Sequence, residues 1–434
     1  MKRTLLLSTL AWIFSLAAAF LVGKSTRPAP KDEDSVMQLP RTGSQTLPLK
    51  RSASSQRRAP GETNSALLAS GGQGARILAR QSPRQAVVEL AQLVDPVERA
   101  KGFLSLVEFL QADEFEGVVA DFRALGVTEQ RMSEYGILLH AWGKVDPVGA
   151  LDYAMTHTGT SFAKETILAS WAAESPEAAL EFARNNHEGD EANPLLVGVI
   201  RGVAPGDLGQ ATDLLQELPY SDERGKALRS MLPFVLEAGV DDAIGWTGRL
   251  ADPRLRSGSI TFLLSEISKS APGQAARIMA GLEDREAAER VADDIGGSLA
   301  RSNLDEAIAW SEALEPDIRS EAVEGVISLY ASRDARAASQ WLESLSGDTN
   351  LDAAIRRFAW HTQAREPELA ANWIHRMTDE RRRNEMYSSV LNRWLRNDAA
   401  AAERWIENTP DLPAGVTALP GRLRDRLNDS DNDR

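Results

Sequence analysis

The sequence predicts an all-α protein, an α-solenoid of about 10–11 two-helix repeats with a period of about 32 residues. Three observations predict this fold. Similar segments recur at a nearly constant spacing, each copy carries a small and a large residue at fixed places, and an amphipathic stripe precedes them. The chain has 434 residues, of which 43% are apolar, so it holds the apolar side chains that an extensive core requires.

The period is clearest in segments 175–182, 366–373 and 398–405, which share one frame. Each begins with a polar residue followed by Pro or Ala, and each ends with an aromatic residue. Counted from the second residue of these segments, equivalent positions fall at 83, 114, 147, 176, 208, 240, 272, 304, 335, 367 and 399. Eleven copies fit the frame, so residues 76–420 are predicted to form the helical-repeat solenoid.

Two places in the frame indicate close packing between helices. The third place after the start holds Ala in ten copies and Gly117 in the other. The sixth place holds a large apolar or aromatic residue in the last nine copies. Five of these are tryptophans that we predict to be repeat core: Trp246, Trp310, Trp341, Trp373 and Trp405. A ligand-binding residue has no reason to recur once per period, whereas a packing residue does.

Each copy is predicted to contain two helices, here called helix A and helix B. Helix A carries apolar residues 12, 9, 8 and 5 places before the start of helix B, which is the spacing of one helix face. Helix B starts at signals such as Asp146-Pro147, where a capping residue precedes a proline at the first helical position. We expect about 14–16 residues in helix A and 11–12 in helix B. Aspartates one period apart, Asp222, Asp252, Asp284, Asp317, Asp348 and Asp379, are predicted to cap helix A.

This layout resembles tetratricopeptide-like helical-hairpin repeats over about residues 76–410, and HEAT-like solenoids more loosely. The tetratricopeptide signature residues are not reproduced and the period is shorter, so the resemblance is to the class of repeats. What the class implies is a scaffold for protein–protein interaction.

The regions outside the repeats have other compositions. In residues 1–23, Lys2 and Arg3 precede an uncharged, leucine-rich run, which predicts a signal peptide or an N-terminal membrane anchor. Ala17 and Ala19 match a cleavage site, but the apolar run continues past them and favours the anchor. Either outcome places the solenoid in the cell envelope, on the periplasmic or extracytoplasmic face. Residues 24–75 are predicted to be a disordered Pro/Ser/Arg-containing linker, and residues 421–434 a polar C-terminal tail.

Composition excludes several kinds of chemistry. The first 75 residues carry 10 Lys and Arg against 4 Asp and Glu, which leaves 39 against 59 and a net charge of −20 for the rest. Such a body repels phosphate backbones, so we predict no nucleic-acid partner. The chain has no cysteine, and its five histidines form no zinc-binding pattern. It has no P-loop and no G-x-S-x-G sequence. We therefore predict no cofactor, no metal and no catalytic residues.

One aromatic residue departs from the repeat frame. The seventh place before helix B is mostly small or polar from residue 140 onward, but Trp360 occupies it in one copy. Basic residues lie near it in the same helix A and in the next. The predicted partner-binding residues are Arg356, Arg357, Trp360, His361, Arg381, Arg382 and Arg383. Arginine and an exposed aromatic residue suit an anionic peptide or glycan. The alternative is a solvated helix face with internal pairs such as Arg381 with Glu385.

The function predicted from these features is an exported or membrane-anchored helical-repeat scaffold that mediates protein–protein interaction or assembly. The alternative is a cell-wall-associated, superhelical protein that binds or cleaves glycan. A glycan-cleaving domain would need roughly 150 residues outside the repeats. Because only the linker and a short tail lie there, we do not predict an enzyme.

Overall fold

The structure is a computed structural model that describes residues 80–345, 347 and 349–423. The predicted segments 1–23 and 24–75 and residues 424–434 of the predicted tail lie outside the described residues. The chain divides into two units, Met1–Arg58 and Ala59–Arg434, and every described residue belongs to the second. Within the described residues the fold is all-α with no strand, as predicted. No helix among them has both the length and the apolar character needed to cross a membrane.

Eleven helices correspond to helix B, and each begins within one residue of its predicted position. They are α4 Pro83–Ala91, α6 Phe115–Ala124, α8 Pro147–His157, α10 Pro176–Asn185, α12 Leu208–Glu217, α14 Val240–Gly248, α16 Pro272–Ala280, α18 Leu304–Glu312, α20 Ala335–Leu345, α22 Pro367–Ile374 and α24 Ala399–Asn408. Their starts are well determined by sequence because the cap, the proline and the alanine are all local signals.

Ten helices correspond to helix A. They are α5 Pro96–Val107, α7 Met132–Val145, α9 Ser161–Ala172, α11 Leu195–Val203, α13 Asp222–Glu237, α15 Pro253–Ser270, α17 Arg285–Ser302, α19 Pro316–Arg333, α21 Asp352–Thr362 and α23 Glu380–Asn397. Short 3-10 turns, Ala112–Glu114 and Glu129–Arg131, lead into α6 and α7, and α25 Ala414–Thr417 follows the last repeat. Residues 421–423, the described part of the predicted tail, are helical.

The lengths of helix A were predicted less well than the starts of helix B. They range from 9 residues in α11 to 18 in α23, against the expected 14–16. Three of the predicted aspartates cap as expected: Asp252, Asp284 and Asp379 accept backbone N–H bonds at the starts of α15, α17 and α23. Asp222 does not, because Ser221 accepts the capping bond from the Arg224 N–H and Asp222 lies in the first turn. Asp317 also lies in the first turn, and Asp348 lies outside the described residues.

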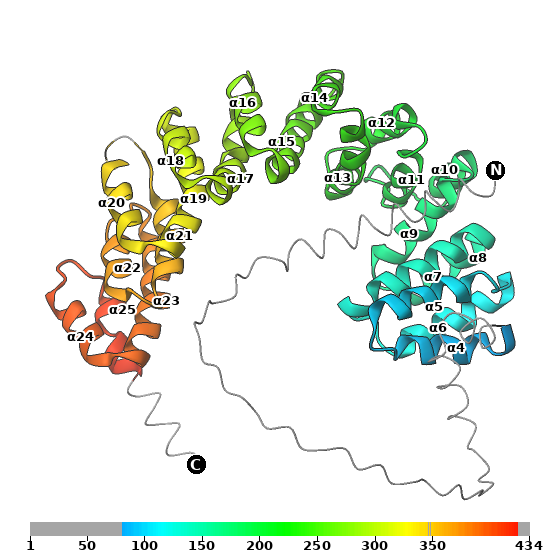
Figure 1. Cartoon of the computed structure of the whole chain (residues 1–434), viewed down its shortest axis with the longest axis horizontal. Helices are drawn as coiled ribbons and strands as arrows, with labels where there is room; N and C mark the ends of the chain where they lie inside the picture. The colour runs from blue at the N-terminus through cyan, green and yellow to red at the C-terminus, as the bar shows by residue number, and fades with distance from the viewer. Residues whose placement is uncertain (1–79, 346, 348, 424–434) are drawn as a thin grey trace, which may run out of the picture. The chain divides into compact units, whose positions relative to one another are not determined.

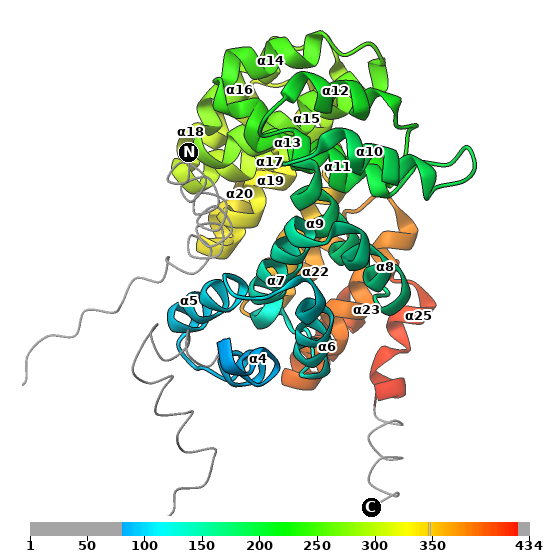
Figure 2. The same cartoon turned by 90° about the vertical axis from the view of Figure 1, so that its right-hand side faces the viewer.

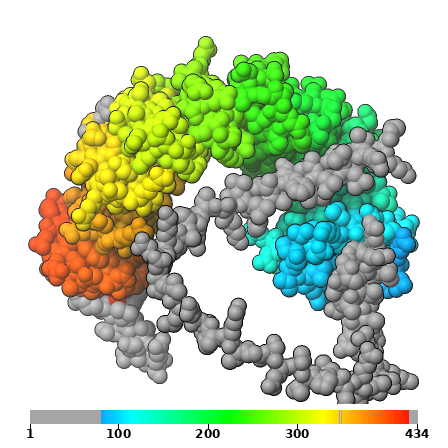
Figure 3. Space-filling model, in the orientation of Figure 1, coloured from blue at the N-terminus to red at the C-terminus, as the bar shows by residue number. Residues whose placement is uncertain are grey.

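The helices form two layers. Each A helix contacts the A helix of the next repeat, and most B helices contact the A helices before and after them. In Figure 1 the B helices α14, α16 and α18 lie on one side of the A helices α15, α17 and α19, and Figure 2 shows the same repeats from the side. The space-filling view shows the hairpins following one another in chain order (Figure 3). Each hairpin therefore completes its core against its neighbours, as a solenoid requires.

The third and sixth places of the repeat frame, where the same kinds of residue recur from copy to copy, lie in the core. All ten alanines at the third place are 0% exposed. Trp246, Trp341, Trp373 and Trp405 are 4–8% exposed, whereas Trp310 is half-buried and packs against the core. The four buried indoles also donate their Nε1–H to the preceding B helix, to Thr212, Glu312, Ser339 and Asn372 at 2.8–2.9 Å. Each of these tryptophans thus links two consecutive repeats by apolar contact and by a hydrogen bond.

Glycines allow some A helices to approach to backbone contact. A Cβ on Gly325 of α19 would collide with the carbonyl oxygen of Asp293 in α17. A Cβ on Gly296 would lie 2.6 Å from the carbonyl oxygen of Ala322. Between α9 and α11, a Cβ on Gly202 would collide with the carbonyl oxygen of Ala169. These positions need glycine because a neighbouring backbone occupies the space of a side chain.

Replacement of Gly325 tests this contact. We expect Gly325→Ala to destabilise the protein by about 1–3 kcal/mol, because α17 and α19 must move apart to admit the methyl group. Urea unfolding followed by circular dichroism measures this change. Gly258, inside α15, is the matched control because a Cβ there has no atom within 4 Å. Gly258→Ala should be neutral or stabilising by up to about 1 kcal/mol. Equal stability of the two variants would contradict the packing described here.

Candidate functional site

The residues seven places before each helix B lie on the face of the A layer that the core does not use. This set, called the A-face column, comprises His140, Ala169, Arg201, Pro233, Ser265, Gly297, Ser328, Trp360 and Asn392. Every member is half-buried or exposed. The A-face column therefore crosses consecutive A helices from α7 to α23, where a ligand could contact several repeats at once.

Trp360 is the large exposed residue of the A-face column. Its side chain is 64% exposed, on the last turn of α21. The opposite face of this short helix is held in the core by Ile355, Phe358 and Ala359. Because α21 is anchored by those residues, the indole of Trp360 is presented to solvent from a fixed helix. A large exposed aromatic residue on a rigid element is typical of binding surfaces.

Arg356 and Arg357 point back toward the preceding repeat. Both donate to Oε1 of Glu324 in α19, at 3.0 and 2.8 Å, and Glu324 is buried. Two further carboxylates lie nearby. Burial and the charges of Asp294 and Glu324 raise the pKa of Asp293, and burial together with Glu324 and Asp293 raises the pKa of Glu321. The two arginines therefore offset a concentration of negative charge inside the protein.

His361 faces a different surface from Trp360. It lines a shallow cleft of about 220 Å³ between the α19–α20 and α21–α22 turns, together with Arg333 and Arg365. Partial burial and the charge of Arg357 lower the pKa of His361. The imidazole is therefore neutral at pH 7 and offers one donor and one acceptor to the cleft.

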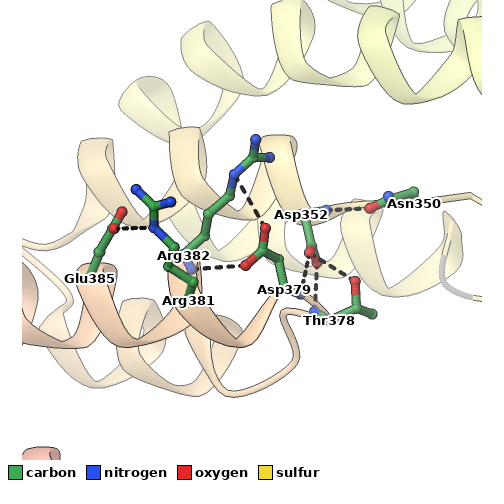
Figure 4. A network of polar contacts seen from close by, with 7 residues as sticks. All are labelled: Asn350, Asp352, Thr378, Asp379, Arg381, Arg382 and Glu385. Atoms are coloured by element: carbon green, nitrogen blue, oxygen red, sulfur yellow. Dashed lines mark hydrogen bonds and ion pairs between the residues drawn. The ribbon is translucent and has the colours of Figure 1, made fainter.

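The arginines at the start of α23 have partners close to them in sequence. Arg381 pairs with Glu385 at 3.0 Å, Arg382 with Asp379 at 3.4 Å, and Arg383 donates to the carbonyl of Met377 at 2.9 Å. Figure 4 shows the first two pairs beside the start of α23. The predicted pair Arg381–Glu385 is therefore present. These three arginines stabilise the first turn of α23 and the segment that leads into it.

Asp352 connects α21 with α23, and sequence analysis did not identify it. Its carboxylate accepts hydrogen bonds from the backbone N–H groups of Thr378 and Asp379 at 2.8 and 2.7 Å, and from Thr378 Oγ1 at 2.8 Å (Figure 4). Burial alone would raise the pKa of Asp352, but these bonds outweigh burial and lower it. The sequence shows an aspartate at this position, but it shows neither the burial of Asp352 nor its partners 26 and 27 residues later.

The seven predicted residues therefore form two groups. Arg356, Arg357, Trp360 and His361 lie on α21, and Arg381, Arg382 and Arg383 begin α23. Within the described part of the chain, no hydrogen bond or ion pair joins the two groups. Arg356 and Arg357 turn toward Glu324 of α19, and Trp360 is the large exposed hydrophobic residue of the first group.

Among residues 80–345, 347 and 349–423, no three His, Asp or Glu side chains come together as a possible metal site. Comparison of the chain with family models, with curated proteins and with solved structures finds no match. The geometry of the A layer is therefore the feature of this chain that bears on its function.

The hydrogen bonds to Asp352 give stability a defined pH dependence. The folded pKa of Asp352 lies below its ordinary value of 3.8, so its stabilising effect is complete above that value and is lost as pH falls through the folded pKa. We expect Asp352→Asn to be less stable than the parent at pH 7. The difference should narrow below about pH 4. Urea unfolding of both proteins between pH 7 and 3 measures it. A difference that stays constant across this range would show that the Asp352 charge contributes nothing.

Proposed function

We propose that this chain is a helical-repeat scaffold of the cell envelope that binds a partner protein through the A-helix face at Trp360. The observation that carries the proposal is the 64% exposure of Trp360 in a column of small and polar residues. A tryptophan buries a large apolar area on binding, and tryptophan and arginine are enriched among residues that dominate binding energy.

The surroundings of Trp360 support a partner with negative charge. Arg356 and Arg357 are about half-exposed one turn away on α21, although both contact Glu324. A carboxylate of the partner could share their remaining N–H donors without breaking that contact, because each guanidinium has five. An apolar side chain beside an acidic one is therefore the partner chemistry that fits.

The export part of the proposal rests on residues 1–23. Their positive start and long apolar run favour delivery to the extracytoplasmic face, as a cleaved or an anchored chain.

An anionic glycan is the second candidate ligand, since tryptophan and arginine also bind sugars with acidic groups. Because an exposed tryptophan also suits a glycan, the experiment below separates a glycan from the proposed protein partner.

Crosslinking and capture from membranes provides the test, with the full chain as bait. The captured partner is identified by mass spectrometry, and its affinity for the purified chain is then measured. We expect Trp360→Ala to weaken that binding about 30-fold, which corresponds to the loss of about 2 kcal/mol at a dominant residue. The free energy of unfolding of the variant should stay within about 0.5 kcal/mol of that of the parent, because the Trp360 side chain is at the surface.

Tyr220→Ala is the matched control. Tyr220 is a 78% exposed aromatic residue between α12 and α13, distant in sequence from α21. Its loss should leave partner binding unchanged. Unchanged binding by Trp360→Ala would refute the proposal. Capture that survives protease treatment but is lost after glycan digestion would identify a glycan as the ligand instead.

A further inference from the structure

The cleft that His361 lines is a second place where this chain can bind a ligand. It lies where the turn between α19 and α20 meets the turn between α21 and α22, in two consecutive hairpins (Figure 1). Its volume is about 220 Å³. Two contacts join its walls: Arg336 Nε pairs with Oε1 of Glu366 at 3.1 Å, and Arg365 Nη1 donates to the carbonyl oxygen of Ser332 at 3.4 Å. The cleft is therefore held between two repeats that are tied to each other.

The side chains that line the cleft are mostly charged. They include three arginines, two carboxylates and one histidine: Arg333, Arg336, Arg365, Asp334, Glu366 and His361. Both carboxylates already have partners. Asp334 accepts capping bonds from the backbone N–H groups of Arg336 and Ala337 at 3.1 and 3.0 Å. Glu366 pairs with Arg336, so two of the three arginines are left without a carboxylate.

Arg333 and Arg365 are these two arginines, and both are exposed. Within residues 80–345, 347 and 349–423, the Arg333 side chain has no hydrogen bond or ion pair, and that of Arg365 has the one contact with Ser332. A guanidinium has five N–H donors, so most donors of this pair are unused and open to solvent. Two helices end and two begin at this edge, so the helix dipoles offset one another and the side chains set the local charge.

His361 adds a neutral donor to the two free arginines. Partial burial and the charge of Arg357, in the same helix, lower the pKa of His361. From the two turns, Arg333, Arg336 and Arg365 face the cleft together with Asp334 and Glu366. A neutral imidazole carries one N–H. An anion in the cleft would therefore meet guanidinium donors from both turns and an imidazole from the end of α21.

The size and lining of the cleft indicate which anion fits. Sites for small molecules are typically roughly 300–1,000 Å³ and mostly apolar, whereas this cleft is smaller, shallow and charged. It suits one side chain of a larger partner better than a whole small molecule. Three guanidinium groups against two carboxylates leave one net positive charge in the lining. A single carboxylate balances that charge, and a dianion would exceed it.

We propose that Arg333, His361 and Arg365 form a carboxylate-binding cleft that takes an Asp or Glu side chain of the partner protein. Arginine offers parallel N–H donors that match a planar carboxylate. Trp360 and His361 are consecutive in α21, so their Cα atoms are about 3.8 Å apart. A partner segment that covers the indole thus reaches the cleft at the end of the same helix. The inference rests on the proposed function in taking the ligand to be the protein that contacts Trp360.

The His361 ring reports on the cleft in the full chain. The ring C–H resonances of the five histidines are followed by NMR, and His361→Gln identifies the signal of His361. The probes are sodium acetate and an acetylated, amidated peptide Ala-Ala-Glu-Ala-Ala, in which the glutamate is the one charged group. The same peptide with Gln in place of Glu is the control, and sodium chloride keeps the ionic strength constant. We expect acetate and the glutamate peptide, but not the glutamine peptide, to shift the His361 signal saturably.

Titration of His361 shows whether the anion lies beside the ring. Saturating acetate should raise the pKa of His361 from its lowered value, because an adjacent anion favours the charged imidazolium. The affinity for acetate should therefore rise as the pH falls from about 7.5 to about 6. A pKa of His361 that is the same with and without acetate would place the anion elsewhere and overturn the cleft.

Variants of the two arginines separate recognition from general charge. Arg333→Gln and Arg365→Gln should each weaken acetate binding about tenfold, and the double variant should abolish the saturable shift. Arg277→Gln removes an exposed arginine of α16 and is the matched control for loss of charge. It should bind acetate like the parent. All of these side chains are at the surface, so each variant should unfold within about 0.5 kcal/mol of the parent, which urea unfolding checks.

Each outcome decides the inference. No saturable shift with acetate, or an equal affinity for acetate in the double variant, overturns the cleft as a binding site. A response to acetate or inorganic phosphate without a response to the glutamate peptide overturns the assignment to an acidic side chain. Once the partner is captured, the double variant should bind it about tenfold more weakly, and unchanged binding overturns the assignment to this partner.

The proposed function and the cleft can fail separately. The acetate and peptide titrations use no aromatic probe and no captured partner, so their failure leaves the role of Trp360 standing. Unchanged partner binding by Trp360→Ala refutes the proposed function, and the acetate response of His361 is then still measured on its own.

Discussion

The solenoid depends on the contact that each helix B makes at its third place. Ten alanines occupy it and are 0% exposed, so helices approach there as closely as a methyl group permits. A hairpin with apolar residues on both helices cannot bury them alone, and stacking at this small residue is what completes the core. In four repeats a buried tryptophan three residues later also spans the junction and donates to the preceding helix B, as Trp373 does to Ser339. Repeat spacing, core and register follow from this one contact.

The sequence predicted features whose causes are local and missed those that depend on neighbouring repeats. Helix B starts were predicted within one residue because cap, proline and alanine lie within one turn. The length of α11, only nine residues, depends on a preceding loop in which Asn193 bonds to the carbonyl of Ala183. The partners of Arg356 and Arg357 were missed for the same reason, since Glu324 lies 32–33 residues away in the adjacent helix A. The exposure of Trp360, by contrast, follows from its column in the frame.

Many arginines of this acidic protein form ion pairs between consecutive repeats. Arg84, Arg184 and Arg336 pair with Asp121, Glu217 and Glu366, at separations of 30–37 residues that match about one repeat. Exposed pairs of this kind contribute little to stability, so they refine the register more than they stabilise the fold. A basic residue in the sequence is therefore weak evidence for a binding site here.

The A-face column lies where close packing of the A helices limits the size of a side chain. Where two A helices touch at glycine, as α17 and α19 do at Gly325, a neighbouring large side chain has no room in the interface. A large residue in the column must therefore extend over the surface of the A layer, as the 64% exposed Trp360 does on α21.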